Sequence, residues 1–418
     1  MSSPNGPRVV VTGMGAISPL GVSVPSLWDG LVNCRNGIGP ITQFDARRYE
    51  CRIAGEASEF DPRAYLPPKA ARRMARCSQM AVAAAREAAE QSELTGSRVD
   101  PERIGVLIGT AMGGWEKADE GTQQFRNSRS PRGNPFALPA SLPNMPSHHV
   151  SQELQTLGPL LTISTSCATG TQAIGEAGEI IRRGAADVMV VGGVEALIRD
   201  FCIAGFSGMR ALPTGFNHSP ERASRPFDRD REGFVFSEGC GVLVLESLEH
   251  ARARGADIMA EVLGHGASAD AFHIAQPDPQ ASGAIRAMRW ALHNARVNAD
   301  EIDYINAHGT STPINDPLET LAIKTLFGKR AYSLPVSSTK SMLGHPLGAS
   351  GALEAIACIM SIRTGMLHPT RNLDNPDPAC DLDYIPHRAR SAPVRTVLTN
   401  SFGLGGQNAA LVLREFNH

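Results

Sequence analysis

The chain has 418 residues, with 40 basic and 42 acidic side chains and a formal net charge of −2. This balance argues against a nucleic-acid-binding protein and against a polybasic membrane protein. A composition of 42% apolar and 20% charged residues is typical of a globular chain rather than a disordered one. At about 100–200 residues per domain, the length predicts two domains or two fused halves.

In chain order, short runs rich in β-branched residues alternate with alanine-rich segments of helical periodicity. The runs predicted as buried strands are 9–11, 106–108, 162–164, 188–191, 242–245, 303–306, 336–338, 397–399 and 409–413. The segments predicted as helices are 69–91, 169–183, 284–295, 317–327 and 349–364. This alternation predicts an α/β fold with largely parallel strands. Residues 126–146, rich in Pro, Asn, Ser and Gly, predict an excursion over the surface or towards a partner subunit.

The cysteines and the apolar segments indicate a compartment. There are eight cysteines, and none lies in a CxxC pair or at zinc-like spacing with histidine. We therefore expect a reduced, cytoplasmic protein. No basic segment followed by an apolar stretch opens the chain, and the longest apolar runs have the length of a strand. Neither a signal peptide nor a membrane span is expected.

A weak internal repeat relates two of the predicted helices. Its residues recur 181 positions apart: alanines at 168 and 349, glycines at 170 and 351, isoleucines at 181 and 362. Both segments are rich in small residues. We expect the two helices to pack closely against each other at a central pseudo-twofold axis.

Cys167 is the first candidate for chemistry. It follows a predicted strand and precedes a helix that opens with Ala168, Thr169 and Gly170. At a helix N-terminus, free N–H groups and the macrodipole favour a thiolate, which predicts a pKa below about 8.5. The alternative is a buried, inert cysteine. The other seven cysteines lack such a context, and we interpret them as structural.

His308 and His345 lie beside glycines in loops that follow predicted strands, where side chains of α/β proteins converge on ligands. A lone histidine would more often be structural. One cysteine with two histidines favours thiol-based acyl transfer. The glycine-rich stretch 400–406 could supply the backbone N–H groups of an oxyanion hole. It lacks both the dinucleotide-binding and the P-loop pattern, which disfavours nucleotide binding.

These motifs together resemble the β-ketoacyl-acyl carrier protein synthases, specifically the elongating synthase II type. The resemblance runs along the chain through VVVTGMGAISPLG (9–21), GTAMGG (109–114), TSCATG (165–170), ADVMVVGGVEA (186–196), ASRPFDRDREGFVFSEGCGVLVLE (223–246), INAHGTSTPIND (305–316), SSTKSMLGHPLGASGALE (337–354) and NSFGLGGQNAALVL (400–413). It implies a thiolase fold, in which two similar βαβ-type halves form α/β/α/β/α layers. The halves would be 1–255, with the nucleophile, and 256–418, with the two histidines. It also implies a homodimer.

The resemblance assigns catalytic roles residue by residue. Cys167 is the expected acyl-accepting nucleophile. His308 and His345 are the expected pair that drives decarboxylation of malonyl-carrier protein. Lys340 is expected to organise the site, with Glu354 as its ion-pair partner.

The resemblance also assigns substrate contacts. Thr310 and Thr312 are the expected hydrogen-bond partners of the phosphopantetheine arm of the substrate. Phe402 is the expected gating aromatic, whose amide joins that of Cys167 in the oxyanion hole. Met112 and Leu404 fall where the family controls access to the acyl pocket.

An acidic acyl carrier protein would require a basic docking surface. In the predicted helix 69–91, Lys69, Arg72, Arg73 and Arg76 share one face at i, i+3, i+4 and i+7 spacing. Arg210 lies at the family's corresponding docking position. The alternative is an ordinary solvated charged face.

The implied function is decarboxylating Claisen condensation of an acyl-enzyme with malonyl-acyl carrier protein in fatty-acid elongation, without a metal or redox cofactor. A second hypothesis is the ketosynthase of a type II polyketide or polyene pathway, paired with a chain-length factor. A chain-length factor itself is disfavoured because Cys167 is present. A thiolase is disfavoured because 400–406 holds no second cysteine. A non-catalytic carrier-binding scaffold is a further alternative, and it would be insensitive to Cys167→Ser.

Overall fold

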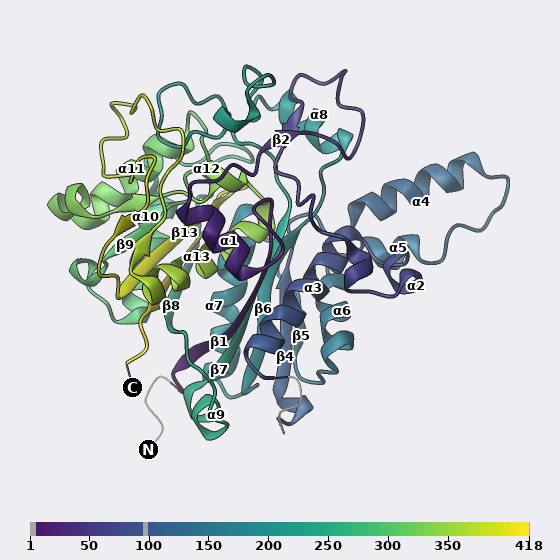
Figure 1. Ribbon diagram of the computed structural model, residues 1–418, viewed down its shortest axis with the longest axis horizontal. Coiled ribbons are helices and arrows are strands. Elements are labelled where there is room, and N and C mark those ends of the chain that lie inside the picture. The colour runs from purple at the N-terminus through teal and green to yellow at the C-terminus, as the bar shows by residue number, and fades with distance from the viewer. Residues whose placement is uncertain (1–5, 95–98, 418) are drawn as a thin grey trace.

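The computed structural model describes residues 6–94 and 99–417, and its main sheet has ten strands in the order β10-β9-β13-β14-β8-β1-β7-β6-β4-β5 (Figure 1). The first half of the chain contributes β1 (Val9–Ile17), β4 (Ile104–Gly109), β5 (Leu160–Leu161), β6 (Val188–Glu195) and β7 (Gly239–Ser247). The second half contributes β8 (Ala260–Ala269), β9 (Tyr304–Asn306), β10 (Val336–Ser337), β13 (Thr396–Gly403) and β14 (Gln407–Arg414). Two short pairs stand apart: β2 (Gly39–Pro40) with β3 (Ile53–Ala54), and β11 (Met366–Leu367) with β12 (Arg390–Ser391).

The two sets of strands repeat one topology. Taken from the centre of the sheet outward, the orders are β1-β7-β6-β4-β5 and β8-β14-β13-β9-β10. In both sets the first strand along the chain is central, followed outward by the fifth, fourth, second and third strands. The sets meet where β1 pairs antiparallel with β8, with Val9 opposite Val262. The predicted division at residue 255 falls between α9 (Leu248–Ala253) and β8.

Helices cover the strands in layers (Figure 1). On the first half, α3 (Arg76–Gln91) and α6 (Met145–Leu154) pack on one face; on the second half, α10 (Ser282–Ala295) packs on β8 and β14. Between the halves lie α7 (Thr169–Arg182) and α13 (Ser350–Thr364), each touching strands of both. The remaining helices are α1 (Val24–Val32), α2 (Pro68–Ala71), α4 (Trp115–Asn127), α5 (Ala137–Ser141), α8 (Asp200–Gly208), α11 (Asn315–Phe327) and α12 (Lys340–Leu343).

The prediction of largely parallel strands is wrong, because the sheet is mixed. The pairs β4–β5, β4–β6, β9–β10 and β9–β13 are parallel, and the other five neighbouring pairs are antiparallel. β1, β6 and β7 are buried along their whole lengths. A continuous apolar run reports burial on both faces of a sheet, but it does not report strand direction.

Two predicted elements differ from those in the structure. The run 162–164 is not a buried strand: the strand is Leu160–Leu161, at the edge of the sheet, where these side chains are 50% and 39% exposed. The predicted helix 69–91 is broken into α2 and α3. α3 begins at Arg76 because the buried carboxylate of Glu116 accepts the Arg76 N–H at 2.9 Å, a cap supplied from another helix.

The excursion predicted at 126–146 begins earlier, inside a helix. α4 projects from the body in Figure 1, and residues 122–136 are all exposed. The chain returns through α5 and α6. The exposed stretch therefore offers its surface to other molecules rather than to the core.

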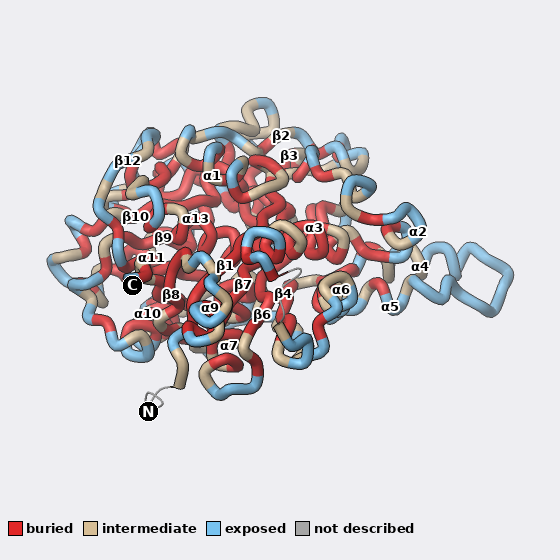
Figure 2. The backbone as a smooth tube through the Cα atoms, turned by 60° about the horizontal axis from the view of Figure 1, so that its bottom comes forward, coloured by how far each residue is buried: buried red, intermediate tan, exposed pale blue. Residues whose placement is uncertain are grey.

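The central helices α7 and α13 pack as the internal repeat predicted. A Cβ added to Gly170 would lie 2.7 Å from the Ala352 nitrogen, and one added to Gly351 would lie 2.1 Å from Thr171 Oγ1. Leu347–Thr364 is apolar and long enough to cross a membrane, yet 83% of it is buried inside the protein. Figure 2 shows this interior as a continuous buried region. α13 is therefore a core helix.

We expect Gly351→Ala to lower the free energy of unfolding by about 3 kcal/mol or more, because the new methyl group overpacks against the backbone of α7. Gly205→Ala in α8 is the control, since its Cβ would meet nothing within 4 Å. Urea denaturation followed by circular dichroism measures both. Equal midpoints for the two variants would contradict the close packing of α7 and α13.

Candidate active site

Cys167 lies on a tight turn between β5 and α7. It belongs to a short 3-10 helix, Ser166–Ala168, and Ser166 is held in the left-handed region at φ 52°. Thr169 stabilises this turn, since its hydroxyl accepts the Thr165 N–H at 2.9 Å and donates to the Ser166 carbonyl at 2.7 Å. The strained turn presents the thiol at the beginning of α7.

The electrostatics of the thiol differ from the prediction. Burial raises the pKa of Cys167 to about 11, opposite to the expected lowering. The Leu404 N–H and the positive charge of Lys340 favour the thiolate, but they offset only part of the cost of burial. At neutral pH Cys167 is therefore a thiol rather than a thiolate.

The two predicted histidines meet, with ring centroids 5.4 Å apart and planes nearly perpendicular. His308 follows β9, and its backbone N–H donates to Glu319 Oε1 at 2.8 Å. His345 follows α12, and its Nδ1 lies 2.9 Å from Ser350 Oγ. Glu319 and Ser350 were not identified from the sequence, although Glu319 closely follows the His308 motif and Ser350 lies within the His345 motif.

Both histidines are neutral in this site. Burial, followed by the nearby charge of Lys340, holds the pKa of His308 and of His345 well below the usual range. Among the described residues, neither His308 Nδ1 nor His345 Nε2 has a hydrogen-bond partner, and both atoms are buried. Buried unpaired nitrogens are rare in proteins, so these atoms indicate a place for a polar ligand atom.

Lys340 and Glu354 form the expected ion pair, with each side chain only 1% exposed. The charge of Lys340 contributes to lowering the pKa of Cys167, His308 and His345 alike. One buried cation thus acts on all three catalytic candidates.

The assignment of the Phe402 and Cys167 amides to the oxyanion hole stays a prediction. Phe402 lies inside β13, and its ring centroid is 5.6 Å from that of His308. The amide that hydrogen-bonds to the Cys167 thiol belongs to Leu404, whose side chain is 39% exposed. Gly403 permits this approach, since a Cβ there would lie 2.9 Å from the Thr165 carbonyl oxygen.

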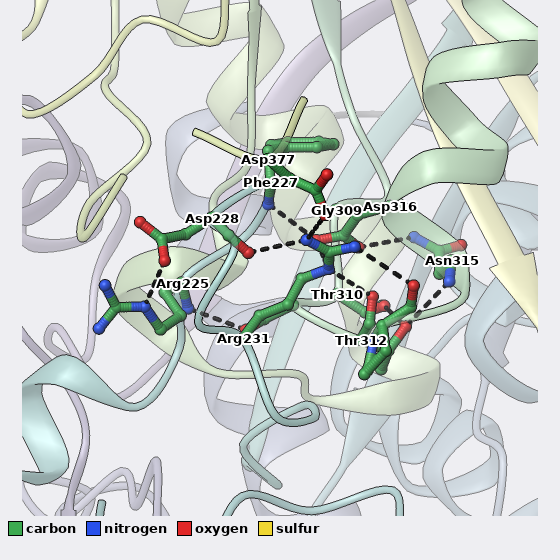
Figure 3. Close-up of polar contacts among 12 residues, drawn as sticks. Arg225, Phe227, Asp228, Arg231, Gly309, Thr310, Thr312, Asn315, Asp316 and Asp377 are labelled. Carbon is green, nitrogen blue, oxygen red and sulfur yellow. Dashed lines mark hydrogen bonds and ion pairs between the residues drawn. The ribbon is translucent and has the colours of Figure 1, made fainter. Parts of the chain in front are cut away.

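Thr310 and Thr312 lie side by side in the loop after His308, with their hydroxyls 3.0 Å apart (Figure 3). Arg231 holds this loop by donating from Nε to the Thr312 carbonyl at 2.9 Å. Asp316 ties it to a second loop by accepting the Phe227 N–H at 2.8 Å. Sequence reasoning missed Arg231 and Asp316, and their signal was only that charged residues occur inside the quoted motifs.

The predicted docking residues do not share one helical face. Lys69 lies in α2, while Arg72 and Arg73 lie in the break before α3; all three are exposed. Arg76 instead pairs with the buried carboxylate of Glu238 at 2.8 Å, and its side chain is only 27% exposed. Arg210 is exposed after α8, a separate element. The basic surface near α2 is therefore smaller than predicted.

Met112 lies in the loop after β4. It is partly buried against the apolar cluster that Cys167 also contacts. Its backbone N–H donates to Glu195 at 3.3 Å. Met112 and Cys167 thus pack against the same apolar cluster.

Comparison with known families identifies the chain. Residues 7–251 match the family described as beta-ketoacyl synthase, N-terminal domain, and residues 259–374 match the corresponding C-terminal domain. The chain belongs to the β-ketoacyl synthase family. This family member is therefore an acyltransferase, and the expected thiolase fold of two similar halves is confirmed.

Relatives of this family member are similar over nearly the whole chain. The 3-oxoacyl-[acyl-carrier-protein] synthase 2 of Synechocystis is 46% identical over 98% of both chains, and that of Coxiella burnetii is 45% identical over 97% of this chain and 98% of its own. A crystal structure of a beta-ketoacyl synthase from Burkholderia phymatum superimposes with a TM-score of 0.91 at 37% identity, over 98% of this chain and 100% of the other. The ishigamide ketosynthase/chain length factor gives a TM-score of 0.91 at 38% identity, over 99% and 100%.

We expect alkylation of Cys167 by iodoacetamide to accelerate about tenfold per pH unit between pH 7 and pH 10, because a thiol with a pKa of about 11 gains thiolate throughout this range. Mass spectrometry of the Cys167 peptide measures the rate, with circular dichroism verifying the fold at each pH. A plateau below pH 8.5 would show a lowered pKa and contradict the effect of burial.

Proposed function

We propose that this condensing enzyme extends acyl chains by decarboxylating Claisen condensation with malonyl-acyl carrier protein, as in fatty-acid elongation. The observation that carries the proposal is the pair of facing, neutral histidines, each with a buried unpaired nitrogen, together with a cysteine on a strained turn at the start of α7. The relatives of 45% and 46% identity, named as 3-oxoacyl-carrier-protein synthases, support the same reaction.

In the first step the Cys167 sulfur attacks the thioester carbonyl of an acyl carrier. The N–H groups of Cys167 and Phe402 would bind the oxyanion of the tetrahedral intermediate. The carbon–sulfur bond to the carrier then breaks. The proton of the Cys167 thiol leaves with the carrier's sulfur, and the acyl group stays on Cys167.

In the second step malonyl carrier protein binds beside the histidines. Its carboxylate leaves as carbon dioxide, and the electron pair of the broken carbon–carbon bond forms an enolate on the thioester oxygen. Neutral His308 and His345 would donate N–H groups to that oxygen. The enolate carbon attacks the acyl-Cys167 carbonyl, and the released sulfur takes up one proton. These bond changes use only side chains, amides and the carrier's phosphopantetheine thioester, so we propose no metal or redox cofactor.

We propose an acyl carrier protein as the macromolecular partner. Exposed Lys69, Arg72, Arg73 and Arg210 would attract an acidic carrier, and Thr310 with Thr312 would bind its phosphopantetheine arm. A structure of a type II polyketide acyl-carrier protein in complex with its ketosynthase, at 34% identity and a TM-score of 0.90, supports such docking.

We also propose a homodimer in a reducing cytoplasm. β5 lies at the edge of the main sheet, and nearby Leu157 and Leu160 are 69% and 50% exposed. An unpaired edge with exposed leucines favours pairing with a second copy.

All eight cysteines are free, which agrees with a reducing compartment.

The protein alone, given hexadecanoyl and shorter acyl carriers, should carry an acyl mass on Cys167 and then release carbon dioxide and a longer β-ketoacyl carrier when malonyl carrier is added. We expect His308→Ala to keep the acylation and to lose decarboxylation about a hundredfold or more, because the enolate loses a donor. His293→Ala, an exposed histidine on α10, is the control. Unchanged decarboxylation in His308→Ala would remove its role.

The same assay decides between two pathways. The second candidate, a ketosynthase that acts with a chain-length factor, is favoured by the ishigamide ketosynthase/chain length factor at 38% identity. Extension of saturated chains by the protein alone supports fatty-acid elongation. Activity only with a partner subunit, or only with polyketone or unsaturated chains, would support the second candidate. The absence of any acyl adduct on Cys167 would overturn both.

Charge reversal tests the docking surface. We expect Arg72→Glu to raise the KM for acyl carrier protein about three- to tenfold and to weaken its salt dependence, since exposed charges mainly steer association. The KM for an acyl-pantetheine thioester without the carrier should not change. Arg289→Glu, exposed on α10, is the control. An unchanged KM for the carrier would exclude Arg72 from docking.

A further inference from the structure

Glu195, the last residue of β6, is a buried carboxylate that none of the catalytic steps uses. Its side chain has no exposed surface, and it accepts four hydrogen bonds. Oε1 accepts from the Thr110 hydroxyl at 3.1 Å and from the Met112 N–H at 3.3 Å. Oε2 accepts from the Ala111 N–H at 2.9 Å and from the Gly348 N–H at 3.2 Å.

These donors come from the two halves of the fold. Thr110, Ala111 and Met112 follow β4 in the first half, whereas Gly348 lies three residues beyond His345 in the second half. Glu195 Oε2 therefore joins the halves through one atom. The two segments are also pressed together, since a Cβ on Gly348 would lie 2.7 Å from the Ala111 nitrogen.

The segments joined by Glu195 border different parts of the site. Met112 packs against the apolar cluster that Cys167 contacts, the surroundings expected for an acyl chain. Phe234 belongs to that cluster, and its ring centroid lies 5.3 Å from the ring of His345. A shift of the backbone at 110–112 would thus be transmitted to the turn that carries the second histidine.

We propose that Glu195 is a positioning residue that couples the acyl-pocket segment 110–112 to the turn carrying His345, so that an acyl chain beside Met112 sets the geometry for decarboxylation. The inference rests on the proposed function. A neutral amide of the same size would not replace the carboxylate. A glutamine presents two N–H groups on one side and would leave either the Thr110–Met112 pair or the Ala111–Gly348 pair without an acceptor.

The test compares Glu195→Gln with wild type in two measurements: the rate of Cys167 acylation by hexadecanoyl carrier, and the rate of carbon dioxide release from malonyl carrier by free and by acylated enzyme. We expect Glu195→Gln to acylate within about threefold of wild type. Carbon dioxide release by its acyl-enzyme should fall about tenfold to a hundredfold, because small misplacements of a catalytic group are costly. The rate of carbon dioxide release by the acylated variant should also depend less on acyl-chain length than the wild-type rate does.

Glu246→Gln is the matched control. Glu246 is also fully buried and accepts from Thr12, but it lies in β7 with Arg254 and His250 as partners. We expect it to lower stability without changing the ratio of decarboxylation by acylated and free enzyme. Thr110→Val removes a single donor to Glu195, so it reports a smaller change in the same direction if Glu195→Gln does not fold.

Three outcomes distinguish coupling through Glu195 from a merely structural role and from failure of the proposed function. A wild-type ratio of decarboxylation by acylated and free enzyme in Glu195→Gln, or in Thr110→Val if that variant alone folds, would overturn the coupling. Acylation and decarboxylation falling in parallel would show a merely structural role and overturn it equally. A wild-type enzyme that neither acylates Cys167 nor releases carbon dioxide would instead overturn the proposed function.

Discussion

The close contact of α7 with α13 is the constraint on which the site depends. Gly170 and Gly351 bring the backbone of each helix against the other, at distances that a methyl group could not share. Cys167 lies just before α7, and His345 lies five residues before the start of α13. Because the two helices cross at their beginnings, residues about 180 positions apart reach one small volume. The same contact lets Glu195 reach both halves.

Within that volume, burial governs the chemistry. It holds both histidines neutral and raises the pKa of Cys167 to about 11. Neutral imidazoles can donate to a developing oxyanion. Lys340 provides a buried positive charge, and its pairing with Glu354 compensates that charge. The attack by Cys167 therefore relies on the donors that bind the thioester oxygen.

Most of the fold could be predicted from periodicity and motifs, but three features could not. Strand direction was missed because the central strands are buried on both faces. The break before α3 was missed because its cap, Glu116, comes from 40 positions further along the chain. The pKa of Cys167 was predicted in the wrong direction because a helix N-terminus is visible in the sequence while the packing around the thiol is not. The pairing of Arg76 with Glu238, which takes Arg76 out of the predicted docking face, was missed because it too depends on tertiary packing.

The sequence by itself determined the residue types of the chemistry, their places after strands and the small residues of the repeated helices, since these follow from local patterns. Only the tertiary structure decided that the Leu404 amide contacts the Cys167 thiol, that Arg231 and Asp316 hold the threonine loop, and that Glu195 bridges the halves. Each of these depends on backbone groups from distant segments. Backbone N–H and carbonyl groups occur at nearly every residue, so no sequence pattern marks the ones that a site uses.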